Sequence, residues 1–428
     1  MFKIPELKKR IIFTLVIIFI YRLGGHVPTP GVNAEVLKNF VAGNSEGLFG
    51  LYDMFVGGNF SRFTVFALGI MPYISASIII QLMGTVFPYF HKLQREGAEG
   101  RKKLTQYTRY GTVLIGLVQA VGLSVFMLSV NDNGVPAVIM NNALFMFTTA
   151  ISLTTGTVVI MWLGEQITSR GIGNGISLII FIGIVAAIPG SVGVQIRQIM
   201  ADQGHVVISL IFLAIVLTAT VAVVIMTQAM RRIPIQTPKK VVGSKMYAGQ
   251  NTVLPLRLNM AGVIPIIFAS SIMTFPGMIG SFLPHSGVWE EISRFFAPGG
   301  IIYSLIYAVL IIFFTYFYTA IVFNPVDIAD NLKRQGGFIP GIRPGKKTAE
   351  FLDNVLARIT LPGSAFLAII AVGPIMLMSS FGGGFYFGGT SILIVVGVAL
   401  DTLQQLESHL QTRNYAGFMK KGSLRGRR

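Results

Sequence analysis

Residues 110–130 read YGTVLIGLVQAVGLSVFMLSV, an apolar stretch without a charged residue. A helix needs about 20 such residues to cross the roughly 30 Å hydrocarbon core of a bilayer. Similar stretches, separated by charged or Gly/Pro-rich segments, fall near 11–27, 65–88, 143–165, 176–194, 207–230, 259–281, 301–323, 359–378 and 388–406. The pattern predicts an all-α polytopic membrane protein with ten transmembrane helices.

The composition argues against a water-soluble enzyme. Of the 428 residues, 53% are hydrophobic and 12% are charged, against about 45–50% and 25% in soluble domains. The absence of cysteine excludes disulfides, thiolate nucleophiles and Cys-ligated zinc. The five histidines lack metal-ligand spacing. Neither GIRPGKKT (341–348) nor RGIGNGIS (170–177) completes a nucleotide-binding motif. We therefore predict no metal, no cofactor and no enzymatic activity.

The distribution of basic residues predicts the orientation. The formal charge is +17, and cations must gather outside the hydrocarbon. If both termini are cytoplasmic, most of the 34 Lys and Arg residues fall in cytoplasmic segments, as the positive-inside rule requires. The exceptions are Arg22, Lys38, Arg62, Arg197 and Arg294. We therefore expect both termini in the cytoplasm.

The segment LFGLYDMFVGGNFSRF (48–63) is amphipathic but too short to span a bilayer, and Gly57-Gly58-Asn59 interrupts it. It is either a re-entrant segment or a helix on the outer surface. Non-helical backbone at membrane depth is tolerated only beside protein or a water-filled cavity. The re-entrant alternative would therefore imply a cavity.

Isoleucine pairs at helical spacing stand beside helix breakers. Ile70 and Ile74 flank Pro72, and Ile176 and Ile180 follow a glycine-rich turn. Residues four apart lie on one helix face, so each pair either projects into a shared constriction or makes ordinary packing contacts. Polar residues along two further helix faces either form a seam or simply pack the helices together. They are Ser75, Ser77 and Gln81 in 65–88, and Asn259, Ser270, Ser271 and Thr274 in 259–281.

The loops 231–258 and 324–358 are longer than orientation requires. Arg343 is bracketed by Pro340-Gly341 and Pro344-Gly345, which favours a stiff projecting tip. Arginine suits bidentate contact with phosphate or carboxylate. The tip is therefore either a dock for RNA or an acidic protein surface, or a solvated turn.

Six segments carry a family resemblance: MPYISASIIIQL (71–82), EGRKKLTQYTRYGT (99–112), MWLGEQITSRGIGNGIS (161–177), NMAGVIPIIFASSI (259–272), FNPVDIADNLKRQGGFIPGIRPG (323–345) and FYFGGTSILIV (385–395). In sequence, order and spacing they closely resemble the bacterial SecY family, the channel subunits of the general protein translocon. The resemblance runs from the first predicted helix to the last.

The resemblance implies two inverted five-helix halves around a central pore, residues 1–194 and 195–428, the latter ending in a basic tail. It implies a plug at about 48–63, with Leu51, Met54, Phe55, Gly57, Gly58 and Phe60. The implied pore ring is Ile70, Ile74, Ile176, Ile180, Ile267 and Ile394. The implied lateral gate comprises Ser75, Gln81, Asn259, Ser271 and Phe275, with Ser75 and Phe275 facing each other. The residues implied to dock cytoplasmic partners are Arg343, Lys245, Lys346 and Lys347.

The same resemblance implies a multi-pass protein of the bacterial cytoplasmic (inner) membrane that passes unfolded secretory polypeptides across it and releases hydrophobic segments laterally into the lipid bilayer. The implied partners are SecE and SecG subunits, the SecA ATPase and the ribosome; the substrates are secretory and membrane proteins. One departure is Gly243-Ser244-Lys245, where relatives often carry two adjacent basic residues. The alternative function is an inverted-repeat solute transporter, which would need a compact polar site at the bilayer midplane.

Overall fold

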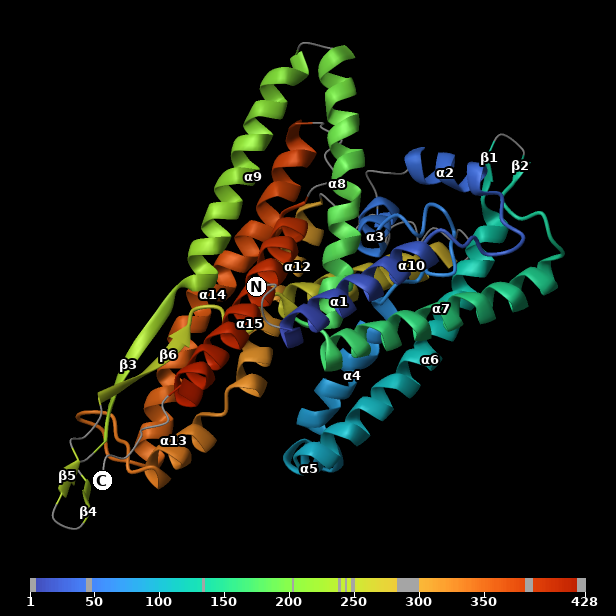
Figure 1. The fold of residues 1–428 in the computed structure, drawn as a ribbon. Coiled ribbons are helices and arrows are strands. Elements are labelled where there is room, and N and C mark those ends of the chain that lie inside the picture. The colour runs from blue at the N-terminus through green and yellow to red at the C-terminus, as the bar shows by residue number, and fades with distance from the viewer. Residues whose placement is uncertain are drawn as a thin grey trace.

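The computed structural model describes residues 5–43, 48–132, 135–201, 204–237, 240–242, 245–247, 251–282, 300–381 and 388–421. Every predicted apolar stretch overlaps a helix (Figure 1). In chain order these are α1 (Pro5–Gly24), α4 (Met71–Val86), α6 (Ala98–Ser129), α7 (Asn142–Arg170), α8 (Gly175–Ala201), α9 (Gly204–Gln228), α10 (Ile264–Phe282), α12 (Ile301–Val322), α14 (Lys346–Phe381) and α15 (Gly389–Lys421). The predicted all-α architecture of ten helices is confirmed.

Seven helices within the described residues are long and apolar enough to cross a membrane, or eight if α4 and the adjoining α5 (Pro88–Arg95) form one span bent by 100°. Pro88 begins α5 at the bend. α1 is not among the seven, because it carries four cations, Lys8, Lys9, Arg10 and Arg22. The apolar stretch begins at residue 65, but α4 begins only at Met71. Gly69 has a positive φ, which is not helical, and Pro72 lies in the first turn, where proline favours the start of a helix.

Shorter elements connect the spans. They are α2 (Ala34–Gly43), α3 (Leu48–Val56), α13 (Pro325–Arg334), β1 (Asn131–Asp132), β2 (Val135–Pro136), β3 (Met230–Gln236), β4 (Lys240–Val242), β5 (Lys245–Tyr247) and β6 (Asn251–Arg257). β3 pairs antiparallel with β6, β4 with β5, and β1 with β2. The segment 231–258, expected to be a loop, is therefore largely two-stranded. Ile233 and Ile235 alternate with exposed residues in β3, as a half-buried strand requires.

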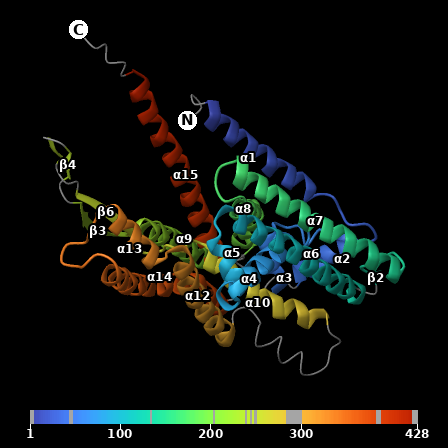
Figure 2. The same ribbon diagram turned by 90° about the horizontal axis from the view of Figure 1, so that it is seen from below.

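The helices pack mainly against neighbours of the same half of the chain. α4, α6 and α7 pack in series, as do α10, α12 and α14, while α15 contacts α9 and α14. α10 crosses between the two groups, since it also contacts α3, α4 and α6. Figure 1 shows α8 and α9 as a long hairpin, and Figure 2 shows α15 projecting beyond the bundle. The expected division at residue 194 lies within α8.

The glycine-rich segment between α7 and α8 is a tight turn, as its spacing predicts. It is tied to two distant helices. The Ile172 N–H donates to Thr14 Oγ1 at 3.1 Å, and the Gly173 N–H donates to Gln405 Oε1 at 2.9 Å. The turn therefore links α1 and α15 to the end of α7.

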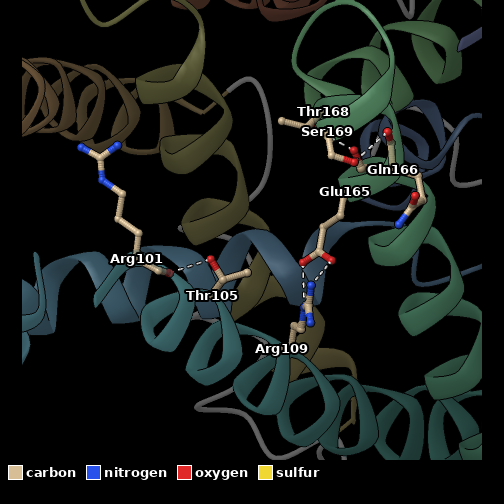
Figure 3. A network of polar contacts seen from close by, with 8 residues as sticks. Arg101, Thr105, Arg109, Glu165, Gln166, Thr168 and Ser169 are labelled. Carbon is tan, nitrogen blue, oxygen red and sulfur yellow. Dashed lines mark hydrogen bonds and ion pairs between the residues drawn. The ribbon is translucent and has the colours of Figure 1, made fainter. Parts of the chain in front are cut away.

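A bidentate ion pair joins α6 to α7 near the same end of α7 (Figure 3). Arg109 Nε donates to Glu165 Oε1 at 3.0 Å, and Arg109 Nη2 donates to Glu165 Oε2 at 2.6 Å. The Arg109 side chain is 48% exposed, so water screens the pair and its contribution is about 0.5 kcal/mol. The pair therefore orients α6 against α7 but adds little to the free energy of unfolding.

Candidate functional site

The six isoleucines of the predicted pore ring belong to four helices and lie in or against the same large apolar cluster. Ile70 immediately precedes α4 and Ile74 lies within it, Ile176 and Ile180 lie in α8, Ile267 in α10, and Ile394 in α15. Five are buried, and Ile176 is half-buried and packs against the same apolar cluster. The structure thus places all six in one cluster; their role as a ring remains a prediction.

The predicted plug contains α3 and the irregular chain that follows it. α3 packs against α8 and α10, and Met54 Sδ accepts a hydrogen bond from Ser391 Oγ at 3.5 Å. Phe60 is 1% exposed, and Phe55 is half-buried. This burial favours the re-entrant alternative over a surface helix. The Leu51 side chain lies outside the described part of the chain.

The turn after α3 is held in place by Asp53. Gly57 and Gly58 have φ of 76° and 78°, so α3 ends in left-handed backbone that suits glycine. Asp53 Oδ1 accepts from the Phe60 and Ser61 N–H groups at 3.0 and 2.9 Å. Burial raises the pKa of Asp53 above its usual value, and these hydrogen bonds oppose that shift. One carboxyl thereby closes the plug segment on itself.

The predicted gate residues lie on or beside α4 and α10, which pack against each other. Ser271 Oγ donates to Met71 Sδ at 3.5 Å, a weak contact across this interface. Ser75 is half-buried in α4. Phe275 lies in α10, but its side chain is outside the described set.

The two amides of the predicted gate are only half-satisfied. Gln81 Nε2 donates to Ser77 Oγ at 3.0 Å, and Asn259 Nδ2 donates to the Gly262 carbonyl at 3.1 Å. Gln81 Oε1 and Asn259 Oδ1 are buried and have no hydrogen-bond partner among the described residues. An unpaired buried amide oxygen weakens an interface, because its desolvation is not compensated.

Three of the four predicted docking residues, Arg343, Lys346 and Lys347, belong to one packed unit, which we call the hairpin–loop unit: β3, β6, residues 323–345 and the start of α14. Gln236 and Phe338 exchange backbone hydrogen bonds of 2.9 Å each. Leu256 of β6 and Leu352 of α14 are fully buried in an apolar cluster separate from the one that holds the isoleucines. The hairpin and the Arg343 loop therefore support each other.

Arg343 is exposed on this unit, and its carbonyl accepts from Thr348 Oγ1 at 2.9 Å. Lys346 and Lys347 are exposed beside it. Lys347 Nζ lies 2.9 Å from Glu350 Oε2, and this hydrogen bond lowers the pKa of Glu350. Lys245 lies in β5, and its side chain is outside the described set.

Several residues in the site were not selected from the sequence. Tyr21 and Asn59 contact the end of α3, and Arg22, noted only as a cation within a span, does so too. Arg22 gave a usable signal, since ionisable residues within membrane helices are costly and usually functional.

Together, the fold and the site define a multi-pass helical membrane protein in which a short helix, α3, packs among the long helices beside a large apolar cluster. A model of the SecY family matches residues 64–403. The SecY translocase subunit of Streptomyces galbus is 46% identical, with 98% of each chain covered. That of Escherichia coli K12 is 44% identical, with 98% of this chain and 96% of the relative covered. The chain belongs to the SecY family.

Solved structures share the fold at low sequence identity. A protein-conducting channel aligns with a TM-score of 0.68 and 18% identity, covering 94% of this chain and 92% of that one. Sec61 from a canine ribosome–channel complex aligns with a TM-score of 0.65 and 18% identity, with the same coverage.

Leu352→Ala tests whether the hairpin and the Arg343 loop form one unit. Deleting this buried side chain should destabilise the unit by about 2–5 kcal/mol. Hydrogen exchange should then accelerate in β3 and β6 as well as in α14. Leu361→Ala is the matched control, because Leu361 is 62% exposed on the same helix. Exchange confined to α14 would show that the hairpin is independent.

Proposed function

We propose that the chain is the channel subunit of a bacterial translocon, which passes unfolded secretory polypeptides across the cytoplasmic membrane and releases hydrophobic segments into it. Membership of the SecY family supports this proposal. The observation that carries it is the insertion of α3 beside the helices that bear the six isoleucines. A narrow aliphatic constriction with an adjoining plug is the arrangement that a protein-conducting pore requires.

An extended chain must cross while ions do not. Aliphatic side chains offer no hydrogen bonds to retain a passing residue, and a narrow apolar constriction excludes water and ions by dewetting. Ile70, Ile74, Ile176, Ile180, Ile267 and Ile394 would form this constriction. The plug adds a second barrier when no polypeptide is present.

Lateral release requires the α4–α10 interface to part. The Ser271–Met71 contact across it is weak, which suits an interface that opens. A segment at the open gate partitions between water and lipid at about −0.3 to −0.6 kcal/mol per central Leu, Ile, Phe or Val, and about +2.5 to +3.5 per central Asp, Lys or Arg. About 20 apolar residues would therefore leave into the lipid.

The partners follow from the family and the surface charge. We infer assembly with SecE and SecG subunits, and docking of the SecA ATPase and the ribosome on the hairpin–loop unit, with both termini cytoplasmic. Arg343 and Lys346 are exposed there. Solved relatives of this fold include Sec61 and Ssh1 complexes bound to ribosomes. The chain itself would perform no covalent chemistry, so its partners would supply the energy.

The alternative, an inverted-repeat solute transporter, calls for substrate-binding polar groups at the midplane. The positions proposed for the constriction carry isoleucine instead, and these side chains lie in or against one large apolar cluster. The deciding experiment reconstitutes the chain with its partner subunits in vesicles and adds SecA, ATP and an unfolded secretory precursor. Protease-protected precursor inside the vesicles is expected. Its absence in a folded, assembled complex would contradict the proposed function.

The first functional prediction concerns the ion seal. Replacing Ile74, Ile180 and Ile267 together by glycine should raise resting conductance in planar bilayers, because the widened constriction admits water. The control replaces Ile79, Ile151 and Ile225 by glycine, since these isoleucines are exposed on helix surfaces. Equal conductance in the two variants would remove the isoleucines from the seal.

The second prediction concerns docking. Arg343→Glu should leave assembly intact and reduce SecA-driven transport at least tenfold. The substitution replaces a guanidinium, which can donate two parallel hydrogen bonds to an anionic partner, by a carboxylate that repels the same partner. Arg334→Glu makes the same charge change at another exposed position of the loop 324–358. Equal transport rates for both variants across salt concentrations would make Arg343 an ordinary solvated turn residue.

The third prediction concerns the gate. The chain has no cysteine, so Ser75→Cys with Phe275→Cys creates a single possible bridge. Oxidation requires Cα atoms within about 7 Å. The bridge should block membrane insertion of a model transmembrane segment, and reduction should restore it. The single variant Ser75→Cys cannot form the bridge, so it shows any other effect of the oxidant on insertion. Full insertion through the oxidised double variant would place the exit elsewhere.

A further inference from the structure

The last turn of α1 binds the carboxyl end of the plug helix. Tyr21 Oη donates to the Val56 carbonyl at 3.3 Å, and Arg22 Nη1 donates to the Gly57 carbonyl at 3.3 Å. Asn59 Nδ2 donates to the Val56 carbonyl at 2.7 Å and to Tyr21 Oη at 3.4 Å. Both Tyr21 and Asn59 are 2% exposed. Three side chains, two from α1 and one from the turn after α3, thus donate hydrogen bonds to the Val56 and Gly57 carbonyls.

The charge of Arg22 suits this position. The carboxyl end of a helix carries a partial negative charge from carbonyls without intrahelical partners, and a cation is favourable there. Val56 is the last residue of α3, and Gly57 follows it. On its other side, Gly57 approaches Gly183 of α8 so closely that a methyl group at Gly57 would lie 2.8 Å from the Gly183 Cα. The end of α3 is therefore enclosed between α1 and α8.

The end of α1 is shaped for the same contact. A methyl group at Gly25 would collide with Asn59 Oδ1, and one at Gly24 would collide with the Phe66 ring. Phe66 stacks on Tyr21 with 5.8 Å between ring centroids. Two adjacent glycines thus permit a close approach that side chains would prevent.

A second link extends the contact beyond Asn59. One ring nitrogen of His26, Nδ1, lies 2.8 Å from the Arg22 carbonyl, and the other, Nε2, lies 3.0 Å from Arg62 Nη1. Arg62 follows the turn that Asp53 closes. The end of α1 therefore contacts the plug segment from Val56 to Arg62.

By contrast, the contacts of α3 with α8, α10 and α15 are weak or apolar among the residues that the structure describes. Met54 meets Ser391 through a sulfur hydrogen bond of 3.5 Å, and Val56 and Phe60 lie in the apolar cluster. Hydrogen bonds from a charged donor are roughly twice as strong as neutral ones. The plug segment is thus bound most firmly at the carboxyl end of α3.

We infer that Arg22, with Tyr21 and Asn59, forms a clamp that fixes the carboxyl end of α3 to α1, so that the plug opens by swinging α3 about this end. The inference rests on the proposed function, because it assumes that α3 blocks a pore. Arg22 is a positioning residue in this account. The clamp returns α3 to the same place after each passage.

Hydrogen exchange on the reconstituted full chain tests the clamp. Arg22→Met should accelerate exchange in residues 48–60 about tenfold, the effect of losing one charged hydrogen bond, while residues 11–20 of α1 keep the wild-type rate. Tyr21→Phe should act in the same direction with a smaller effect. Arg22→Lys, which retains a cation within reach, should restore slow exchange. Arg197→Met is the matched control, because it removes an exposed arginine from α8.

Resting conductance in planar bilayers provides the second readout, and Arg22→Met should raise it above that of Arg197→Met. Unchanged exchange in residues 48–60 would overturn the clamp, as would accelerated exchange spread evenly over α1, which would indicate general destabilisation. Accelerated exchange with wild-type conductance would overturn its role in keeping the plug in place. Failure of the proposed function is distinguishable, because wild-type protein would then translocate no precursor whatever the exchange rates.

Discussion

Backbone polar groups buried away from water must find partners within the protein, and the irregular chain between α3 and α4 is where this constraint is most demanding. Residues 57–70 are irregular, yet most of their amides donate hydrogen bonds within the segment, to α3 or to the chain after α1. The Thr64 N–H donates to the Asn59 carbonyl at 3.0 Å, and the Val65 N–H donates to the Val27 carbonyl at 3.0 Å. Asp53 accepts two more amides. An irregular segment satisfied in this way can lie among helices without water.

This arrangement reconciles two opposing requirements. In the proposed function, a seal must exclude ions, which favours tight apolar packing, but the plug and the gate must also move. Covalent links are absent, and the described contacts across α4–α10 and between α3 and α15 are sulfur hydrogen bonds of 3.5 Å. The stronger contacts lie elsewhere, such as the Arg109–Glu165 pair between α6 and α7. The interfaces that we propose to move are thus joined by weak hydrogen bonds, whereas α6 and α7 are joined by an ion pair.

The spans could be predicted from the sequence because hydrophobicity over about 20 residues is a local property. The hairpin of β3 and β6 was missed, since MRRIPIQ is short and its alternation is interrupted by a proline. Spacing alone paired Ile70 with Ile74 and Ile176 with Ile180, but Ile267 and Ile394 were reached only through the family resemblance. The contacts of Tyr21 and Arg22 with residues 35 positions away could not be predicted, because they depend on tertiary packing.

The two apolar clusters are connected by one continuous element. α14 contributes Leu352 to the hairpin–loop cluster and Leu367 to the cluster of isoleucines. Between them lie Pro362, which cannot donate a backbone hydrogen bond, and Gly363, where a methyl group would lie 2.7 Å from the Leu258 carbonyl at the end of the hairpin. Pro362 therefore interrupts the hydrogen bonding of α14 where the end of the hairpin approaches the helix. Along α14, the exposed Arg343 loop and the cluster of isoleucines lie on opposite sides of this interruption, so the hairpin packs at the point where the connection between the two clusters is interrupted.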